Sequence, residues 1–183
     1  MKLGLKIILP ILLLLIVLLG AFSYLLYNLK QQEVIISAET SKIQKLNSLN
    51  ERLAREQDIT VYNVLAYRFN QDKVSLFSIS QAELDKAKTL DEMHPFIKTS
   101  KGLELVNRYI DTRKEVEPLR NGLIKAIDEG DEEQISLNYN KWSIQTQNIK
   151  AAQTDIGAYN INSLEKTLAT FKDVRNEIGS VRF

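Results

Sequence analysis

The chain starts with an apolar stretch long enough to cross a lipid bilayer. Residues 7–29 read IILPILLLLIVLLGAFSYLLYNL and carry no charged side chain. A helix of this length rises about 35 Å, whereas the hydrocarbon core of a bilayer is about 30 Å thick. So apolar a surface is stable only inside a membrane or a protein core, and we predict that residues 7–29 span a membrane once.

The charges on the two sides of this stretch predict its orientation. Lys2 and Lys6 precede it, and Lys30 and Glu33 follow it. Because cytoplasmic flanks of membrane helices carry the excess of Lys and Arg, we expect the N-terminus to stay in the cytoplasm. Residues 1–29 are then a cytoplasmic stub and transmembrane helix, and residues 30–183 are extracytoplasmic. In a bacterium this is a single-pass protein of the inner membrane with its bulk in the periplasm.

A cleavable signal peptide is the alternative interpretation. Residues 7–19 would be its apolar region, and Ala21-Phe22-Ser23 a weak cleavage signature. Against it, residues 24–29 continue the apolar stretch beyond such a cut, and no polar segment separates them from the helical pattern that follows. The anchor is favoured, and both interpretations export the rest of the chain.

Composition excludes several functional classes. The chain has no Cys and a single histidine, His94, which rules out disulfides, a Cys/His zinc site and a His-containing catalytic triad. Lys and Arg number 24 against 23 Asp and Glu, and this balance does not favour nucleic-acid binding, which needs a basic surface. Neither a Gly-rich phosphate loop nor a GxSxG sequence occurs. We therefore expect no enzymatic activity, no metal and no cofactor.

The remainder of the chain has the periodicity of long helices. Between residues 31 and 70, apolar side chains recur at three- and four-residue steps, namely Ile36, Ile43, Leu46, Leu49, Leu53, Val61, Val64, Leu65 and Phe69. The turn-forming sequence Asn70-Gln71-Asp72 predicts the first break.

A second helix is expected over residues 73–93. Its inward side chains are predicted to be Val74, Phe77, Leu84 and Ala87. A short strand over residues 74–80 (VSLFSIS) is the alternative, but no partner strand is apparent, so the helix is favoured.

Proline and glycine positions separate the last two helices. His94-Pro95 predicts a connection, after which Ser100 can cap a third helix. Pro118 lies inside that helix and is expected to kink or split it. Gly130 suits the left-handed position after a helix, and Asp131 suits the N-cap of a fourth helix over residues 132–180.

Four helices joined by short connections bury one another's apolar stripes as an antiparallel bundle. The predicted fold is therefore all-α, an N-terminal transmembrane helix followed by a four-helix bundle over residues 30–183. Because so narrow a bundle buries more apolar surface by pairing, we expect a homodimer. An even number of helices also returns the C-terminus towards the membrane.

This arrangement resembles the four-helix-bundle sensory domain of bacterial methyl-accepting chemotaxis receptors and related sensor kinases. Its most local element is Val64–Phe77 (VLAYRFNQDKVSLF), which resembles the helix–turn–helix at the end of the first bundle helix in that family. There, aromatic residues precede a short turn with an Asp, here Asp72. The resemblance implies an extracytoplasmic sensory and interaction region that transmits binding through its last helix.

The resemblance also implies where a ligand binds. Chemoreceptors of this fold hold small anions between subunits with arginines of the first bundle helix, where this chain has Arg52, Arg55 and Arg68. Arg52 and Arg55 are three residues apart and share a face, on which both can bind one carboxylate, whereas Arg68 points elsewhere. Ion pairs with neighbouring carboxylates are the alternative interpretation.

Three further features favour a structural interpretation. His94 is expected to be a turn residue, and Trp142 a core residue rather than a binding platform. The acidic run of residues 128–133 lacks the alternating ligands of a calcium loop, so helix capping explains it better.

The chain departs from the receptor family at its C-terminus. A receptor continues into a second spanning helix and a cytoplasmic signalling module, and the sequence ends at residues 180–183 (SVRF) with neither. It is then either the N-terminal part of a receptor or a single-pass envelope scaffold that docks partner proteins on its bundle.

Overall fold

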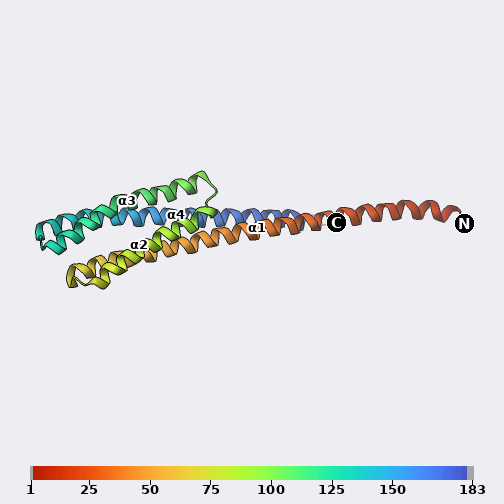
Figure 1. Ribbon diagram of the computed structural model, residues 1–183. Coiled ribbons are helices and arrows are strands. Elements are labelled where there is room, and N and C mark those ends of the chain that lie inside the picture. Colours follow the sequence, from red (N-terminus) through yellow and green to blue (C-terminus); the bar gives the residue numbers. More distant parts are fainter. Residues whose placement is uncertain (1, 181–183) are drawn as a thin grey trace. The chain divides into compact units, whose positions relative to one another are not determined.

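The computed structural model describes residues 2–180, and every regular element in that range is helical (Figure 1). The elements are α1 (Lys2–Asn70), α2 (Lys73–Met93), a short 3₁₀ turn η1 (His94–Phe96), α3 (Ser100–Glu129) and α4 (Glu132–Ser180). The predicted all-α fold is confirmed, and the alternative of a strand over residues 74–80 is wrong.

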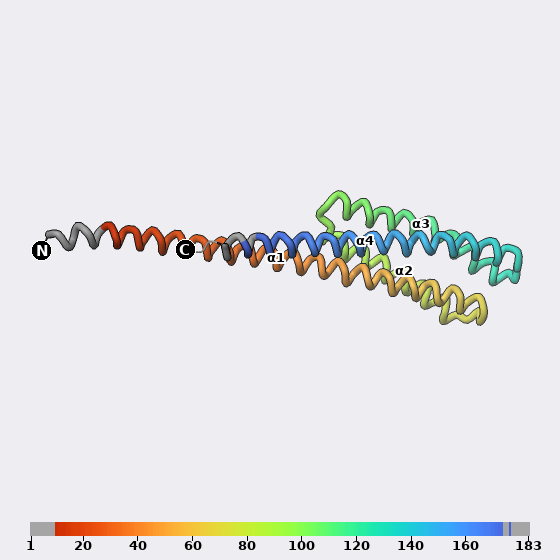
Figure 2. The backbone as a smooth tube through the Cα atoms, turned by 180° about the vertical axis from the view of Figure 1, so that it is seen from behind, coloured from red at the N-terminus to blue at the C-terminus, as the bar shows by residue number. Residues whose placement is uncertain are grey.

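The chain divides into two compact units. The larger contains residues 42–166, and the smaller contains the first part of α1 up to residue 41 together with α4 from residue 167 on. The larger unit includes the whole of α2 and α3, which the backbone trace in Figure 2 lets the reader follow. The buried apolar core also lies in this unit.

Helix α1 packs against both α2 and α4 within the larger unit. The Arg52 guanidinium lies 3.3 Å from the Glu92 carboxylate of α2. On the α4 side, Gln153 Nε2 donates to the Asn50 carbonyl at 2.9 Å, and Asn50 Nδ2 donates to the Gln153 carbonyl at 3.3 Å. The partner on α2 changes from Glu92 to Lys86 between Arg52 and Gln57, and the partner on α4 changes from Gln153 to Tyr139 between Asn50 and Arg68. Residue numbers fall on the partner as they rise on α1, so each pair is antiparallel.

Helix α3 closes the bundle between α2 and α4. The Arg113 guanidinium lies 3.0 Å from the Glu83 carboxylate of α2. On its other side, Asn138 Nδ2 of α4 donates to the Gly122 carbonyl at 3.2 Å. The four helices therefore follow one another around the bundle in chain order, as short connections require.

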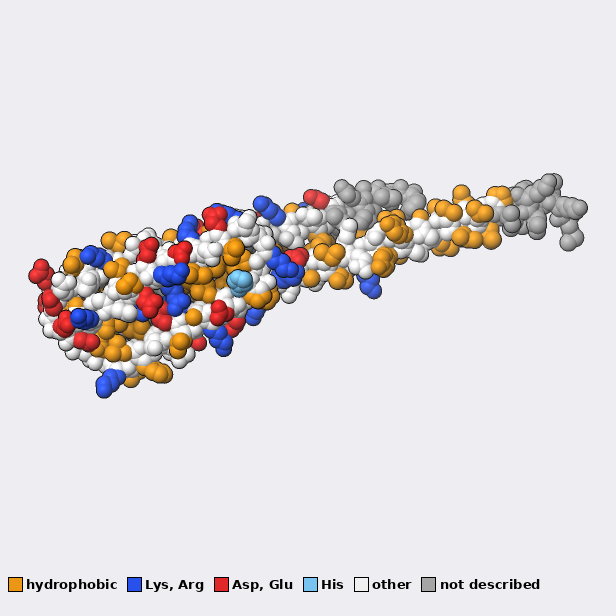
Figure 3. Space-filling view, turned by 45° about the horizontal axis from the view of Figure 1, so that its top comes forward, with side chains coloured by type: hydrophobic (Ala, Val, Ile, Leu, Met, Phe, Trp, Pro, Cys, Tyr) orange, Lys and Arg blue, Asp and Glu red, His pale blue; other side chains and the backbone are white. Residues whose placement is uncertain are grey.

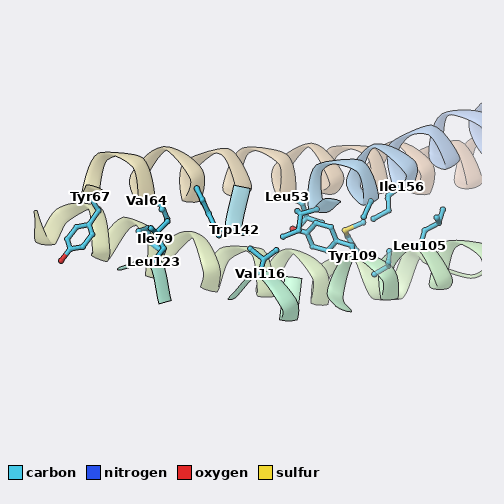
Figure 4. Close-up of a cluster of buried hydrophobic side chains, with 14 of the residues drawn as sticks. Leu53, Val64, Tyr67, Ile79, Leu105, Tyr109, Val116, Leu123, Trp142 and Ile156 are labelled. Atoms are coloured by element: carbon cyan, nitrogen blue, oxygen red, sulfur yellow. The ribbon is translucent and has the colours of Figure 1, made fainter. Parts of the chain in front are cut away.

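The core is a column of apolar side chains contributed by all four helices (Figure 4). Leu53, Tyr109 and Leu123 are fully buried within it, and Trp142 is 2% exposed, as predicted for a core tryptophan. Its other members with large side chains are Leu49, Val64, Tyr67, Ile79, Met93, Leu105, Val106, Val116, Ile127, Ile135, Ile149 and Ile156.

The connections use the turn residues that the sequence predicts. Gln71 adopts φ 49°, and the Asp72 carboxylate caps α2 by accepting the Ser75 backbone N–H at 2.7 Å. Gly130 follows α3 with φ 67°, and Asp131 caps α4 by accepting the Gln134 N–H at 3.0 Å. Each cap satisfies a donor that a helix start leaves unpaired.

Two details of α3 differ from the sequence-based expectation. Thr99 rather than Ser100 is the N-cap, since its Oγ1 accepts the Gly102 N–H at 3.0 Å. Of the two outcomes expected at Pro118, a split is wrong, since the helix is continuous from Ser100 to Glu129, and a kink stays a prediction. A proline removes one backbone hydrogen bond, and the buried neighbours Val116 and Leu123 hold both halves against the core.

The inward face predicted for α2 is wrong. Val74, Phe77 and Leu84 are 73%, 70% and 64% exposed, and only Ala87 is half-buried. The residues that α2 buries are Ser75, Ile79, Ala82, Lys86, Thr89 and Met93. The residues of both sets recur at helical spacing, so the periodicity alone does not predict which face of α2 is buried. Phe69, predicted as part of the α1 stripe, is also exposed, at 80%.

Among the described residues, α1 is the one helix long and apolar enough to cross a membrane. Large apolar side chains between Ile11 and Leu19 are each exposed over half or more of their surface. In the space-filling view this stretch is almost entirely hydrophobic, whereas the larger unit mixes acidic and basic side chains (Figure 3). An apolar surface of this extent indicates association with a membrane.

Gly122 inside α3 and Gly130 directly after it test where this helix ends. Gly130→Ala should lower the free energy of unfolding by about 1 kcal/mol, because a side chain is strained at φ 67°. Gly122→Ala should raise it by up to about 1 kcal/mol, because alanine favours the helix interior and its Cβ would meet Asn138 at an ordinary 3.7 Å. Chemical denaturation measures both, and effects of the same sign would contradict the assignment.

Candidate functional site

A lysine is buried at the middle of the bundle. The side chain of Lys86 on α2 is 1% exposed. Its Nζ donates to Gln57 Oε1 at 2.9 Å and to Thr60 Oγ1 at 3.1 Å, both on α1. A third contact, at 2.6 Å, goes to Glu83 one turn away on α2. All three ammonium hydrogens thus have an oxygen acceptor, which an ammonium needs when water is excluded.

Glu83 is shared by two further cations from α3. Arg113 donates from Nε to Glu83 Oε2 at 3.1 Å and from Nη2 to the Glu83 backbone carbonyl at 3.2 Å. Arg120 Nη1 lies 2.6 Å from Glu83 Oε1, the same oxygen that Lys86 contacts. One carboxylate therefore links three positive charges across two helices.

The cluster carries an excess of positive charge in a region of low exposure. The side chains of Arg120, Glu83 and Arg113 are 8%, 16% and 22% exposed. Glu117 is the nearest additional carboxylate, 3.9 Å from Arg120, but it is 55% exposed. With both carboxylates counted, the cations still outnumber the anions by one.

Burial perturbs the pKa of both partners of the central pair. Loss of water lowers the pKa of Lys86, against the opposing effect of Glu83 and together with repulsion from the two arginines. For Glu83, burial raises the pKa, but attraction to Lys86, Arg120 and Arg113 outweighs it and holds the pKa below its usual value. The pKa of Lys86 and the pKa of Glu83 are thus both lowered, the first mainly by burial and the second by the three neighbouring cations.

Helical spacing on each helix brings the cluster together. Glu83 and Lys86 are three residues apart on α2, so their side chains are neighbours. Arg113 and Arg120 are seven residues apart, which is about two turns and places them on one face of α3. The two α1 acceptors are likewise three residues apart.

Several buried donors of α3 and α4 lack a hydrogen-bond partner among the described residues. These are Trp142 Nε1, Thr146 Oγ1 and the Tyr109 hydroxyl. Trp142 also lines an interior cavity of about 10 Å³ together with Glu83, Arg113 and other members of the cluster. Burial raises the pKa of the Tyr109 phenol, so this hydroxyl stays protonated.

An open groove between α2 and α3 reaches the cluster from solvent. Its volume is about 450 Å³. Glu83, Arg113, Glu117 and Arg120 line both this groove and the interior cavity. The rest of its lining is mainly apolar and consists of Leu76, Ile79, Leu84, Ala87 and Ile124, with Ser80 and Asn121.

The arginines predicted to bind a ligand lie elsewhere. Arg52 is paired with Glu92 of α2, and Arg55 is exposed. Neither lines the groove between α2 and α3. Arg68 points towards α4, with its guanidinium 5.1 Å from the centre of the Tyr139 ring. A joint role for Arg52 and Arg55 in holding an anion stays a prediction.

The other candidate residues occupy structural positions. His94 is exposed at the start of η1, in the connection where the sequence places it. In the acidic run, Asp131 caps α4 and Asp128 accepts a hydrogen bond from the Tyr67 hydroxyl. Over the residues that the structure describes, no three His, Cys, Asp or Glu side chains group as metal ligands.

Sequence analysis did not identify the buried cluster. Lys86 and Glu83 look like an ordinary surface pair at i and i+3, and the arginines lie in a helix with many charges. The available signal was the polar stripe of α2, in which Ser75, Lys86 and Thr89 follow helical steps of their own. The same helix also carries a more apolar stripe, which predicts the opposite face as the buried one. The polar stripe is favoured only when the partners that α1 and α3 supply are known.

Comparisons with protein-family models, curated proteins and solved structures gave no match in any of the three. The resemblance to chemotaxis receptors therefore stays a prediction from the sequence.

Removing the Glu83 charge should destabilise the bundle strongly. Glu83→Gln should lower the free energy of unfolding by about 3–5 kcal/mol, because it leaves two buried cations, Lys86 and Arg120, and the half-buried Arg113 without their carboxylate. The matched control is Glu117→Gln, which removes an exposed carboxylate near Arg120 and should cost less than about 1 kcal/mol. Urea unfolding of both variants measures the difference, and equal losses would contradict a special role for Glu83.

The same pair of variants has a pH signature. Because the folded-state pKa of Glu83 lies below its usual 4.5, its contribution is complete above that pH and is lost as pH falls through the folded pKa. Glu83→Gln should therefore flatten the acid limb of the stability curve, with Glu117→Gln measured beside it as the exposed control.

Proposed function

We propose that this chain is the extracytoplasmic sensory and interaction region of a chemotaxis-type transmembrane receptor in a bacterial inner membrane. In this proposal residues 7–29 anchor the chain with its N-terminus in the cytoplasm, and the bundle binds its ligand outside. The last helix transmits binding by a small sliding or rotation, on the order of 1–2 Å, of the kind that packed helices allow.

One observation carries the proposal. Helix α1 runs without interruption from an apolar stretch long enough to cross a bilayer to one wall of a bundle with a charged interior. A helix that belongs to both parts supports a bundle that is anchored to the membrane, as a sensory region of a receptor requires. Lys2 and Lys6 before the apolar stretch support the orientation.

A homodimer is the assembly that we propose for the bundle. Five large apolar side chains are exposed around the α1–α2 connection, and we call them the outer apolar face: Tyr62, Phe69, Val74, Phe77 and Leu84. Tyr62 and Phe69 are seven residues apart on α1, as are Phe77 and Leu84 on α2, so each pair lies on one side of its helix.

The size of this face favours a second copy as its occupant. The five side chains are 64–80% exposed and present on the order of 600 Å² of surface. That sum is at the upper end of the roughly 300–600 Å² found for the largest apolar patch of a typical monomer, and a standard interface takes roughly 800 Å² from each partner. A two-fold axis through this face would set the same apolar patch of each copy against the other.

The native protein tests the receptor assignment. Mass analysis of the product in its own membranes should find a chain that continues beyond residue 183 into a second apolar span and a cytoplasmic module. Because the sequence has no Cys, a single Asn107→Cys on exposed α3 can be labelled with an impermeant maleimide. We expect labelling in intact spheroplasts and none in sealed inside-out vesicles.

The opposite results have a definite meaning. A product that ends near residue 183 with the same labelling pattern would overturn the receptor assignment and leave a single-pass scaffold. Labelling only in inside-out vesicles would overturn the orientation.

The dimer proposal is tested by sedimentation of the full chain in detergent micelles. Val74→Ser with Phe77→Ser should raise the dimer Kd by about a hundredfold or more, since each buried apolar side chain contributes about 1.5–3 kcal/mol. The matched control is Leu137→Ser with Ile144→Ser, which removes two exposed apolar side chains from α4. A monomeric wild-type chain, or equal effects of the two double variants, would contradict the proposal.

A further inference from the structure

We propose that the groove between α2 and α3 binds a small organic anion, a carboxylate with an apolar body, whose charge is held by Arg113 and Arg120. This inference rests on the proposed function in one respect, because it names the ligand class that a sensory bundle would detect. The site itself is argued from the side chains of the larger unit alone.

Uncompensated positive charge is the first argument. Lys86, Arg113 and Arg120 converge on the single buried carboxylate of Glu83, and the half-exposed Glu117 is too distant to share their hydrogen bonds. An unbalanced charge in a region of low exposure costs free energy. With Glu83 and Glu117 both counted, the excess is one positive charge, and the carboxylate of a bound anion would offset it.

Free donors are the second argument. Arg113 uses Nε and Nη2 on Glu83, and its Nη1 makes no hydrogen bond to the described residues. Arg120 directs Nε and Nη2 at Asn121 Oδ1, a neutral acceptor that a carboxylate would outcompete. The guanidinium groups line the groove, so they are reached from solvent without unfolding the bundle.

An unpartnered buried donor gives independent support. Trp142 is 2% exposed, its Nε1 has no partner among the described residues, and it lines the interior cavity beside Arg113 and Arg120. A buried indole N–H normally has an acceptor. The cavity and the groove share Arg113 and Arg120 in their linings, so an anion held by these arginines would lie close to the cavity that Trp142 lines.

The apolar part of the groove defines the rest of the ligand. The groove has apolar side chains on both sides of the arginines along the helix axes. On the side of the α1–α2 connection these are Leu76, Ile79 and Ile124, and on the other side they are Leu84 and Ala87. A volume of about 450 Å³ fits a small molecule, and ligand sites of this kind combine an apolar lining with a few polar groups. A purely inorganic anion would leave this lining in water, so the geometry favours an organic acid.

Calorimetric titration of the full chain in detergent micelles tests the site. The probe is hexanoate in a low-chloride buffer, with hexanol as the neutral analogue, sulfate as the inorganic anion and empty micelles as the blank. We expect saturable binding of hexanoate, at least tenfold weaker binding of hexanol and sulfate, and a rise in Tm with hexanoate concentration.

Variants separate the groove from the rest of the molecule. Arg113→Gln and Arg120→Gln should each weaken hexanoate binding at least tenfold. Ala87→Phe fills the groove without removing a charge and should also abolish binding, so the test survives if an arginine variant fails to fold. Arg108→Gln is the matched control, because Arg108 is an exposed arginine of α3 outside the groove, and binding should be unchanged.

Each other outcome overturns the proposal in a specific way. If hexanol binds as tightly as hexanoate, the charge of the ligand does not contribute to binding. If sulfate binds as tightly as hexanoate, the apolar body does not contribute. Loss of binding in Arg52→Ala with Arg55→Ala but not in Arg113→Gln would move the site to α1. Absence of hexanoate binding overturns the ligand class, while the receptor assignment still stands or falls on the mass and labelling of the native product.

Discussion

The Glu83 carboxylate accepts from one lysine and two arginines, and the packing of α2 against α1 and α3 depends on that contact. Without it, the interior would hold three cations and no buried anion. The Lys86 ammonium also donates to two acceptors on α1, Gln57 and Thr60. A single ion cluster therefore connects three of the four helices. Apolar packing is tolerant of small shifts along a helix, whereas hydrogen bonds at 2.6–3.1 Å are not.

This cluster explains why α2 is turned with its most apolar stripe outward. The helix carries two stripes at helical spacing, one of Val74, Phe77 and Leu84 and one that contains Ser75, Ile79 and Lys86. Burying the first would have placed Lys86 in solvent and left Arg113 and Arg120 without Glu83. The second is buried because the neighbouring helices supply acceptors for its lysine and cations for its glutamate.

The orientation of α2 creates two surfaces with different properties. The outer apolar face offers an area suited to a second copy, and the groove against α3 combines guanidinium groups with aliphatic side chains. Leu84 belongs to both, so a ligand in the groove and a partner on the face would meet at one side chain. In the proposed receptor, this shared residue would couple ligand binding to the assembly of the dimer.

Local sequence was sufficient for the elements and insufficient for the site. Asp72, Gly130 and Asp131 end and begin helices because their own backbone and side-chain chemistry requires it, so the breaks could be predicted within a residue. Thr99 replaced Ser100 as a cap because two adjacent hydroxyl residues compete for the same role. The spacing of Arg52 and Arg55 made them plausible ligand-binding residues. Spacing within one helix cannot show that Arg52 forms an ion pair with Glu92 of another helix.

The order of apolar and polar residues along each helix was sufficient to predict that this chain is all-α and that its first helix carries a stretch able to cross a membrane. The tertiary structure alone decided which face of α2 is buried. It also decided that Lys86, Glu83, Arg113 and Arg120 form one cluster. The reason is that the free energy of burying a charge depends on partners from other helices, and those partners are distant in sequence.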